Sequence, residues 1–227
     1  LDHAIDLEPS NATTRDWRAA LYLWTARTAD ALADAESASA TNPLAPIPHA
    51  EVARVLGADG RCREALARLE RIGALTPPVG RVAIIAAHCN ARLGQWQHAL
   101  TELGANLPPH QALRGHLLAR YGSRTDAKAI REQLVTRYQA GEVGAFPLAV
   151  IDAGLGDNDS AIEWLTLSLD DQSLAGTPDH LTVMLAVLEA MPDEPRLNQF
   201  KPLAPLLARR LNAARGAIPV SQHPAGR

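Results

Sequence analysis

GRCREALARLERI (residues 60–72) and GQWQHALTEL (residues 94–103) begin 34 residues apart, and in each an alanine stands five positions after the opening glycine. The same step of 34 separates Pro9, Pro43 and Pro77, so three residue types share one period. A period of this length accommodates two helices of about 13 residues joined by short turns. The repeat therefore predicts an array of helical hairpins.

The rest of the chain fits this period with one shortened repeat. The step from Ala99 to Ala127 is 28 residues, and the step from Ala127 to Ala161 returns to 34. Apolar residues at helical spacing predict the second helix of each hairpin over 28–40, 60–72, 94–103, 123–138 and 158–169. The first helices are expected around 12–26, 46–58, 80–93, 110–121 and 143–154. Asp126 and Asp157 are expected to cap helix starts.

The composition favours helices over strands. Alanine occupies 42 of 227 positions, hydrophobic residues make up 47% and aromatic residues only 4%. Small side chains suit closely packed helices, whereas strands favour β-branched and aromatic residues. We therefore expect an all-α fold.

Small residues recur at fixed places within each repeat, and in this the chain resembles a tetratricopeptide repeat (TPR) array. In that family's frame the repeats are counted here from residues 12, 46, 80, 108 and 142. Position 8 then holds Ala19, Ala53, Ala87, Gly115 and Ala149, and position 15 holds Gly60, Gly94, Gly122 and Gly156. Position 20 holds Ala31, Ala65, Ala99, Ala127 and Ala161. Such residues let paired helices approach closely. The resemblance implies an all-α TPR-type α-solenoid, a right-handed superhelix of antiparallel hairpins.

The repeat frame divides the chain into four parts. We expect residues 1–11 to be the remnant of a preceding repeat, because the chain starts inside a helical pattern, and we expect a longer parent protein. Residues 12–177 form five TPR-like hairpins, the last two divergent because they lack the proline of position 32. Residues 178–212 are expected to form capping helices, which a solenoid needs for solubility. Residues 213–227 lack periodicity and are expected to be a mobile tail.

Charge and hydropathy narrow the range of partners. The net charge of -3 and the pI near 6.2 provide no positive field for a phosphate backbone, so direct nucleic-acid binding is not expected. Apolar runs are far shorter than the roughly 20 residues that cross a bilayer. We expect a cytoplasmic location, or a periplasmic one if the parent has an upstream transmembrane helix.

The sequence contains no recognisable catalytic or metal-binding motif. His88, Cys89 and His98 lack the spacing of metal ligands. LGDNDSAIE (residues 155–163) lacks the central glycine and the twelve-residue ligand pattern of a calcium loop. Gly154 and Gly156 match only part of a dinucleotide fingerprint. We therefore expect no enzyme activity, no cofactor and no metal site.

The TPR resemblance places one set of side chains on the concave surface, where this family's first helices face a partner. The set is Trp24, Arg54, Arg81, His88, Arg92, His116 and Arg120, with Asp16 beside them. Arginine is a good donor to carboxylates, so an acidic peptide or an acidic segment of the parent is the expected occupant. The alternative is a solvated face in a chain with 20 arginines and 2 lysines. Asp16 and Ala20 replace the family's lysine and asparagine, which excludes the carboxylate clamp for chaperone tails.

Two stretches, ALADAESASATNPLAPIPHAEVARVL (residues 31–56) and AFPLAVIDAGLGDNDSAIEWLTLSL (residues 145–169), resemble TPR regions that follow effector domains in bacterial signalling proteins. Such regions occur in winged-helix transcriptional regulators, adenylate cyclases and serine/threonine kinases. This similarity implies a non-catalytic interaction or sensory module, most simply of a transcriptional regulator. A stand-alone assembly scaffold and a small-ligand sensor of a cyclase or kinase are the alternatives. Any oligomerisation is expected to come through the parent.

Cys62 and Cys89 are the only cysteines in the sequence. They fall near the start of one helix and the end of the next, and consecutive helices run antiparallel, so the two thiols are expected to approach each other. The favoured interpretation is a pair of small side chains that fill an interhelical gap. A disulfide would imply an oxidising compartment.

Overall fold

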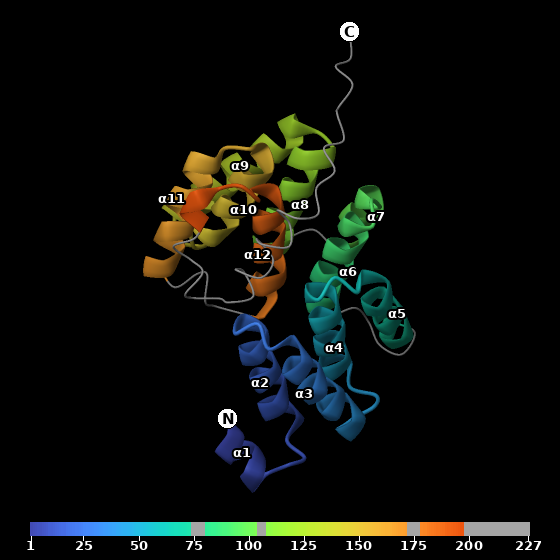
Figure 1. Cartoon of the computed structure of the whole chain (residues 1–227). Helices are drawn as coiled ribbons and strands as arrows, with labels where there is room; N and C mark the ends of the chain where they lie inside the picture. The colour runs from blue at the N-terminus through green and yellow to red at the C-terminus, as the bar shows by residue number, and fades with distance from the viewer. Residues whose placement is uncertain (74–79, 104–107, 172–177, 198–227) are drawn as a thin grey trace.

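The computed structural model describes residues 1–73, 80–103, 108–171 and 178–197 (Figure 1). Within these ranges the regular structure is entirely helical, which confirms the expected all-α class. The first helices of the hairpins are α2 (Ala12–Trp24), α4 (Pro46–Ala58), α6 (Gly80–Arg92), α8 (Pro108–Tyr121) and α10 (Phe146–Leu155). The second helices are α3 (Thr28–Thr41), α5 (Cys62–Gly73), α7 (Trp96–Glu102), α9 (Arg124–Gln139) and α11 (Asn158–Asp170). Two further helices are α1 (Asp2–Leu7) and α12 (Pro178–Ala190).

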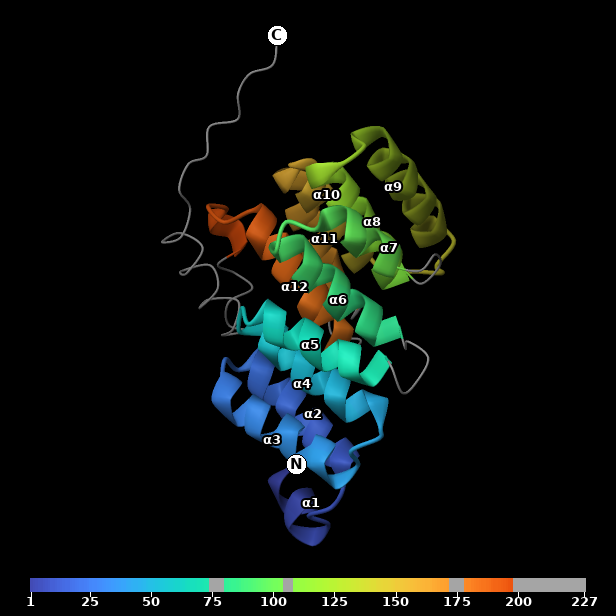
Figure 2. The ribbon, with the colours of Figure 1, turned by 90° about the vertical axis from the view of Figure 1, so that its right-hand side faces the viewer.

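The helices pair as hairpins that stack along one axis. Each first helix packs against the second helix that follows it, and also against the next first helix in the chain. Figures 1 and 2 show this stack running from α1 and α2 at one end to the hairpins α8–α9 and α10–α11 at the other. The architecture is therefore a TPR-type α-solenoid, as the period predicts.

Short polar caps and glycine turns define the hairpins. The turn glycines Gly60, Gly94 and Gly156 have φ angles of 88°, 80° and 76°, a region that disfavours side chains. The Asp157 carboxylate accepts from the Ser160 amide at 3.1 Å, which confirms the predicted cap of α11. The expectation for Asp126 is wrong, because the Ser123 hydroxyl caps α9 and accepts from the backbone amide of Asp126.

The small residues of the repeat lie where helices cross. All five alanines of position 20 are completely buried: Ala31, Ala65, Ala99, Ala127 and Ala161. At position 8, the alanines are equally buried and Gly115 is enclosed between α8 and α10. The small residues that the repeat frame places at helix crossings are therefore buried, as the sequence predicts.

Helices α8 and α10 approach each other closely at two glycines. A β-carbon on Gly154 would lie 2.9 Å from the Cα and carbonyl oxygen of His116, and one on Gly115 would lie 2.7 Å from the Ile151 side chain. This proximity also lets the His116 ring of α8 form a hydrogen bond with α10, where its Nδ1 lies 2.9 Å from the carbonyl oxygen of Val150. Glycine on both helices therefore fixes the spacing of the last two hairpins.

Helix α12 has a wider role than the expected cap. It contacts α10 of the last hairpin, and it also reaches α8, α6 and α4. Because it crosses first helices from four hairpins, it covers one side of the array rather than only its end. Most of the second capping helix expected up to residue 212, and the tail over 213–227, lie outside the described residues.

The two cysteines meet as predicted. Cys62 at the start of α5 and Cys89 near the end of α6 are both buried. A hydrogen bond with Cys62, together with burial, raises the pKa of the Cys89 thiol. Neither thiol forms a disulfide, which agrees with two small side chains filling the space between α5 and α6.

Gly154→Ala is expected to destabilise the chain by about 1–3 kcal/mol, because its new methyl group must displace the backbone of α8. Gly73→Ala on α5 is the matched control, since a β-carbon there meets nothing within 4 Å. That control should be neutral or slightly stabilising. Chemical denaturation measures both, and equal stability of the two variants would contradict the close crossing.

Ala65→Leu is expected to lower stability by about 1–3 kcal/mol, because Ala65 is fully buried at a crossing and no space exists for the added atoms. Ala67 lies two residues further along α5 and is exposed, so Ala67→Leu is the control and should change stability little. Thermal midpoints of the two variants provide the comparison. An unchanged midpoint for Ala65→Leu would count against the repeat register.

Candidate binding groove

The side of the array formed by the first helices is called here the first-helix groove. The first helices α2, α4, α6 and α8 carry the seven residues that the sequence assigns to partner binding, and these residues differ in exposure. Buried members are Arg54, His88 and His116, half-buried members are Trp24 and Arg81, and exposed members are Arg92 and Arg120. Fewer of these side chains are therefore available to a partner than the repeat frame implies.

Arg54 is buried because α4 is surrounded by α2, α3, α5, α6 and α12. Its guanidinium binds both carboxylate oxygens of Glu51 one turn earlier, with Nε 2.9 Å from Oε2. The Glu51 side chain is only 1% exposed. A buried charge requires such a partner, and the pair makes Arg54 part of the core rather than part of an open surface.

Arg81 and Asp16 extend this cluster across three first helices. Arg81 Nη1 on α6 lies 3.8 Å from Glu51 Oε2 on α4. On α2, burial and then the nearby Glu51 raise the pKa of Asp16 to about 7, although Arg81 and Arg54 oppose the change. Asp16 Oδ1 is buried and has no hydrogen-bond partner within the described ranges. The carboxyl of Asp16 therefore holds a proton at a pH where an ordinary aspartate is ionised.

The two predicted histidines also belong to the interior. His116 on α8 is 3% exposed, and burial lowers its pKa to about 4. Its ring is therefore neutral near pH 7 and holds the Val150 carbonyl oxygen of α10 through Nδ1. His88 on α6 is equally buried. Both imidazoles serve helix packing, so neither offers an open contact.

Helix α12 packs against the first helices α4, α6, α8 and α10 on the side of the first-helix groove. Its place beside α8 and α10 can be followed in Figure 1. The helix is apolar on nearly every side, a pattern typical of a helix that is enclosed by other helices. Its buried residues form one continuous run: Thr182, Val183, Met184, Leu185, Ala186, Val187 and Leu188. The apolar run TVMLAVL (residues 182–188) indicates from the sequence that this helix is buried, but it does not identify the surface that covers it.

One ion pair joins α12 to the exposed arginines of the groove. Glu189 Oε1 in the last turn of α12 lies 3.4 Å from Arg92 Nη1 at the end of α6. A small cavity lies beside this ion pair, and Arg92, Glu189, Arg120 and Tyr121 all line it. An acidic side chain therefore already faces Arg92, and it comes from the chain itself.

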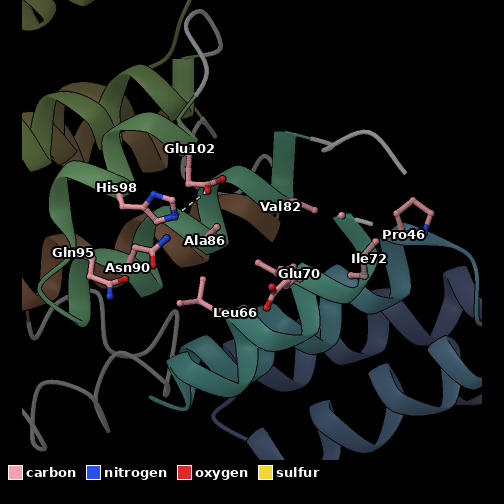
Figure 3. Close-up of a pocket in the computed structure, with 12 residues that line it drawn as sticks. Pro46, Leu66, Glu70, Ile72, Val82, Ala86, Asn90, Gln95, His98 and Glu102 are labelled. Atoms are coloured by element: carbon pink, nitrogen blue, oxygen red, sulfur yellow. Dashed lines mark ion pairs between the residues drawn. The ribbon is translucent and has the colours of Figure 1, made fainter. Parts of the chain in front are cut away.

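A second concave surface, called here the outer trough, lies between α5, α6 and α7 (Figure 3). Its volume is about 470 Å³. Val82, Ala86 and Asn90 follow one face of α6 and form the floor, since they are spaced by four residues. The walls come from α5 and α7, and none of the expected partner-binding residues lines this trough.

Metal and membrane sites are absent from the part of the chain that the structure describes. Across residues 1–73, 80–103, 108–171 and 178–197, no cluster of three or more His, Cys, Asp or Glu side chains is arranged to hold a metal ion. No helix in these ranges has the length and apolar character needed to span a bilayer.

Comparison with known proteins yields one similar structure. No protein-family model matches the chain. No curated protein matches it either. A solved structure, that of YrrB, a TPR protein with an unusual peptide-binding site, is 19% identical with a TM-score of 0.46, over 82% of this chain and 96% of that one. The fold assignment rests on the helix pairing within this chain.

Asp16→Asn is expected to stabilise the chain more at pH 8 than at pH 5. Between about pH 4 and pH 7 the folded chain keeps a proton that the unfolded chain releases, so stability falls as the pH rises through this window. Asparagine removes that dependence, and the midpoint should rise by about 2 °C or more at pH 8. Thermal unfolding at both pH values measures the difference. Asp59→Asn, at an exposed position after α4, is the control; an equal response of both variants would contradict the assignment.

Proposed function

We propose that the chain is a non-catalytic interaction module whose first-helix groove receives a helical segment of a partner or of the parent protein. The observation that carries this proposal is the placement of α12, which crosses α4, α6, α8 and α10 and pairs with Arg92 through Glu189. A groove that encloses one apolar helix has the shape and chemistry to bind another. Helix-in-groove recognition is a recurring mode of protein association.

The occupant of the groove defines the ligand chemistry. Val183 and Val187 lie one turn apart on α12 and are fully buried, whereas Glu189 lies beside Arg92 and Arg120 at the rim. The ligand is therefore an apolar helix with a carboxylate near its C-terminal end. This deepens the acidic-peptide expectation, because the apolar face supplies most of the binding and the carboxylate sets the orientation.

Helix α12 acts as an intramolecular competitor in this proposal. A partner helix binds only the fraction of molecules whose groove is open, so its apparent affinity falls by that fraction. Met184 lies in this helix and Met191 directly after it, and both are buried. Methionine packs adaptably, which suits a helix that is exchanged for another.

The proposal includes a parent protein of the bacterial signalling class, in which this module follows an effector domain of a transcriptional regulator in the cytoplasm. The support is the resemblance of residues 31–56 and 145–169 to such TPR regions. The competing proposal is an assembly scaffold without an effector domain. A winged-helix sequence found upstream of residue 1 in the full-length protein would contradict the scaffold proposal. A regulatory domain of a cyclase or kinase that senses a small ligand is favoured only by the outer trough, whose volume suits a small molecule.

The groove assignment predicts that a fluorescent peptide of residues 178–191 binds to a full-length variant with Val183→Asp and Val187→Asp. These substitutions place carboxylates on the buried face of α12 and release it, whereas the unsubstituted chain keeps its groove filled. The peptide should bind the variant at least about tenfold more tightly than the unsubstituted chain. Fluorescence anisotropy measures both affinities, and circular dichroism checks that the variant remains helical.

The control variant carries Ala129→Asp and Gln133→Asp, at two exposed positions with the same spacing on α9. It should bind the peptide no better than the unsubstituted chain. A peptide with Glu189→Arg should bind weakly, and Arg92→Glu in the released variant should recover part of that loss. Equal binding to released and unsubstituted chains, or no binding to a helical released variant, would contradict the proposal.

A further inference from the structure

The outer trough is bounded by three helices and has a mostly apolar interior. Val82 and Ala86 of α6 form its floor, and Leu66, Leu69 and Ile72 of α5 form one wall. The α5 wall belongs to the second helix of one hairpin, and the opposite wall, on α7, belongs to the second helix of the next. The trough is therefore separate from the first-helix groove and from α12.

The rim of the trough is acidic. Glu70 of α5 and Glu102 of α7 face the opening from opposite walls (Figure 3). His98 Nε2 lies 3.3 Å from Glu102 Oε1 and pairs with it when protonated. Among the described residues that line the trough, none is lysine or arginine. In a chain with 20 arginines, this surface therefore carries the opposite charge to the groove.

The dimensions of the trough suit a short helix. Its floor runs from Val82 to Asn90 of α6, and these eight residue steps correspond to about 12 Å along a helix axis. Two turns of a partner helix cover that distance. A helix between two walls that are themselves helical packs its side-chain ridges into their grooves.

We propose that the outer trough binds an amphipathic helical segment of a partner protein, with leucine-like residues on one face and arginine or lysine beside them. The apolar face covers Val82, Ala86 and Leu69, and the basic side chains pair with Glu70 and Glu102. Charge complementarity selects this occupant over an acidic helix such as α12, because an acidic side chain would face two carboxylates.

The test uses the full chain and a fluorescent synthetic peptide of about 14 residues, long enough to form helix when bound. The peptide carries leucines at i, i+4 and i+7 and two flanking arginines. Binding by anisotropy should weaken roughly fivefold or more with Glu70→Gln and Glu102→Gln together. Val82→Trp fills the floor and should weaken binding at least about tenfold. The same peptide with glutamate in place of arginine should not bind.

Glu163→Gln is the matched control, because this exposed glutamate lies on α11 outside the trough. It should leave the affinity unchanged, and circular dichroism should show that every variant keeps its helix content. The released α12 variant should bind the basic peptide as well as the unsubstituted chain does, which separates this proposal from the function of the groove.

Three results would overturn the proposal. Equal weakening by Glu163→Gln would show attraction to overall charge, and an affinity unaffected by Val82→Trp would place the peptide elsewhere. Binding of octylammonium, blocked by Val82→Trp, without binding of the peptide would reassign the trough to a small amphipathic cation.

Discussion

The structure depends on helices that cross at alanine or glycine. Ala31, Ala65 and Ala99 are completely buried at equivalent places, and no larger residue fits there without separating the helices. At Gly154 even an alanine would be too large, because His116 backbone atoms occupy the space that a β-carbon would need. Close crossings stack the hairpins tightly, and tight stacking leaves a row of first helices with apolar surface on the side of the first-helix groove.

The apolar surface of the first helices explains the position of α12. First helices such as α4 are enclosed by neighbours on several sides, and α12 covers the face that the hairpins themselves leave open. Carboxylates that fall inside the array then need fixed partners, and arginine supplies them in forked pairs. Arg131 binds Asp152 through two nitrogens, and Arg18 binds Asp34 in the same way. Several arginines therefore neutralise buried acids.

Two surfaces of opposite character remain for partners. The first-helix groove holds an apolar helix and presents Arg92 and Arg120 at its rim, whereas the outer trough has an apolar floor with Glu70 and Glu102 above it. The two lie on opposite sides of α6, because α12 contacts one side of that helix and Val82 and Ala86 line the other. One helix thus supplies the floor of both proposed sites, and their charges direct them to different partners.

The sequence by itself determined the repeat, the helix pairs and the small residues at their crossings, because these follow from local periodicity and from a spacing of 34 that recurs along the chain. It also placed Cys62 beside Cys89. Only the tertiary structure decided which concave residues stay exposed. Arg54 turns inward to Glu51 and His116 to Val150 because neighbouring helices surround them. The position of α12 could not be predicted, since its run of apolar residues requires burial without specifying the surface that provides it.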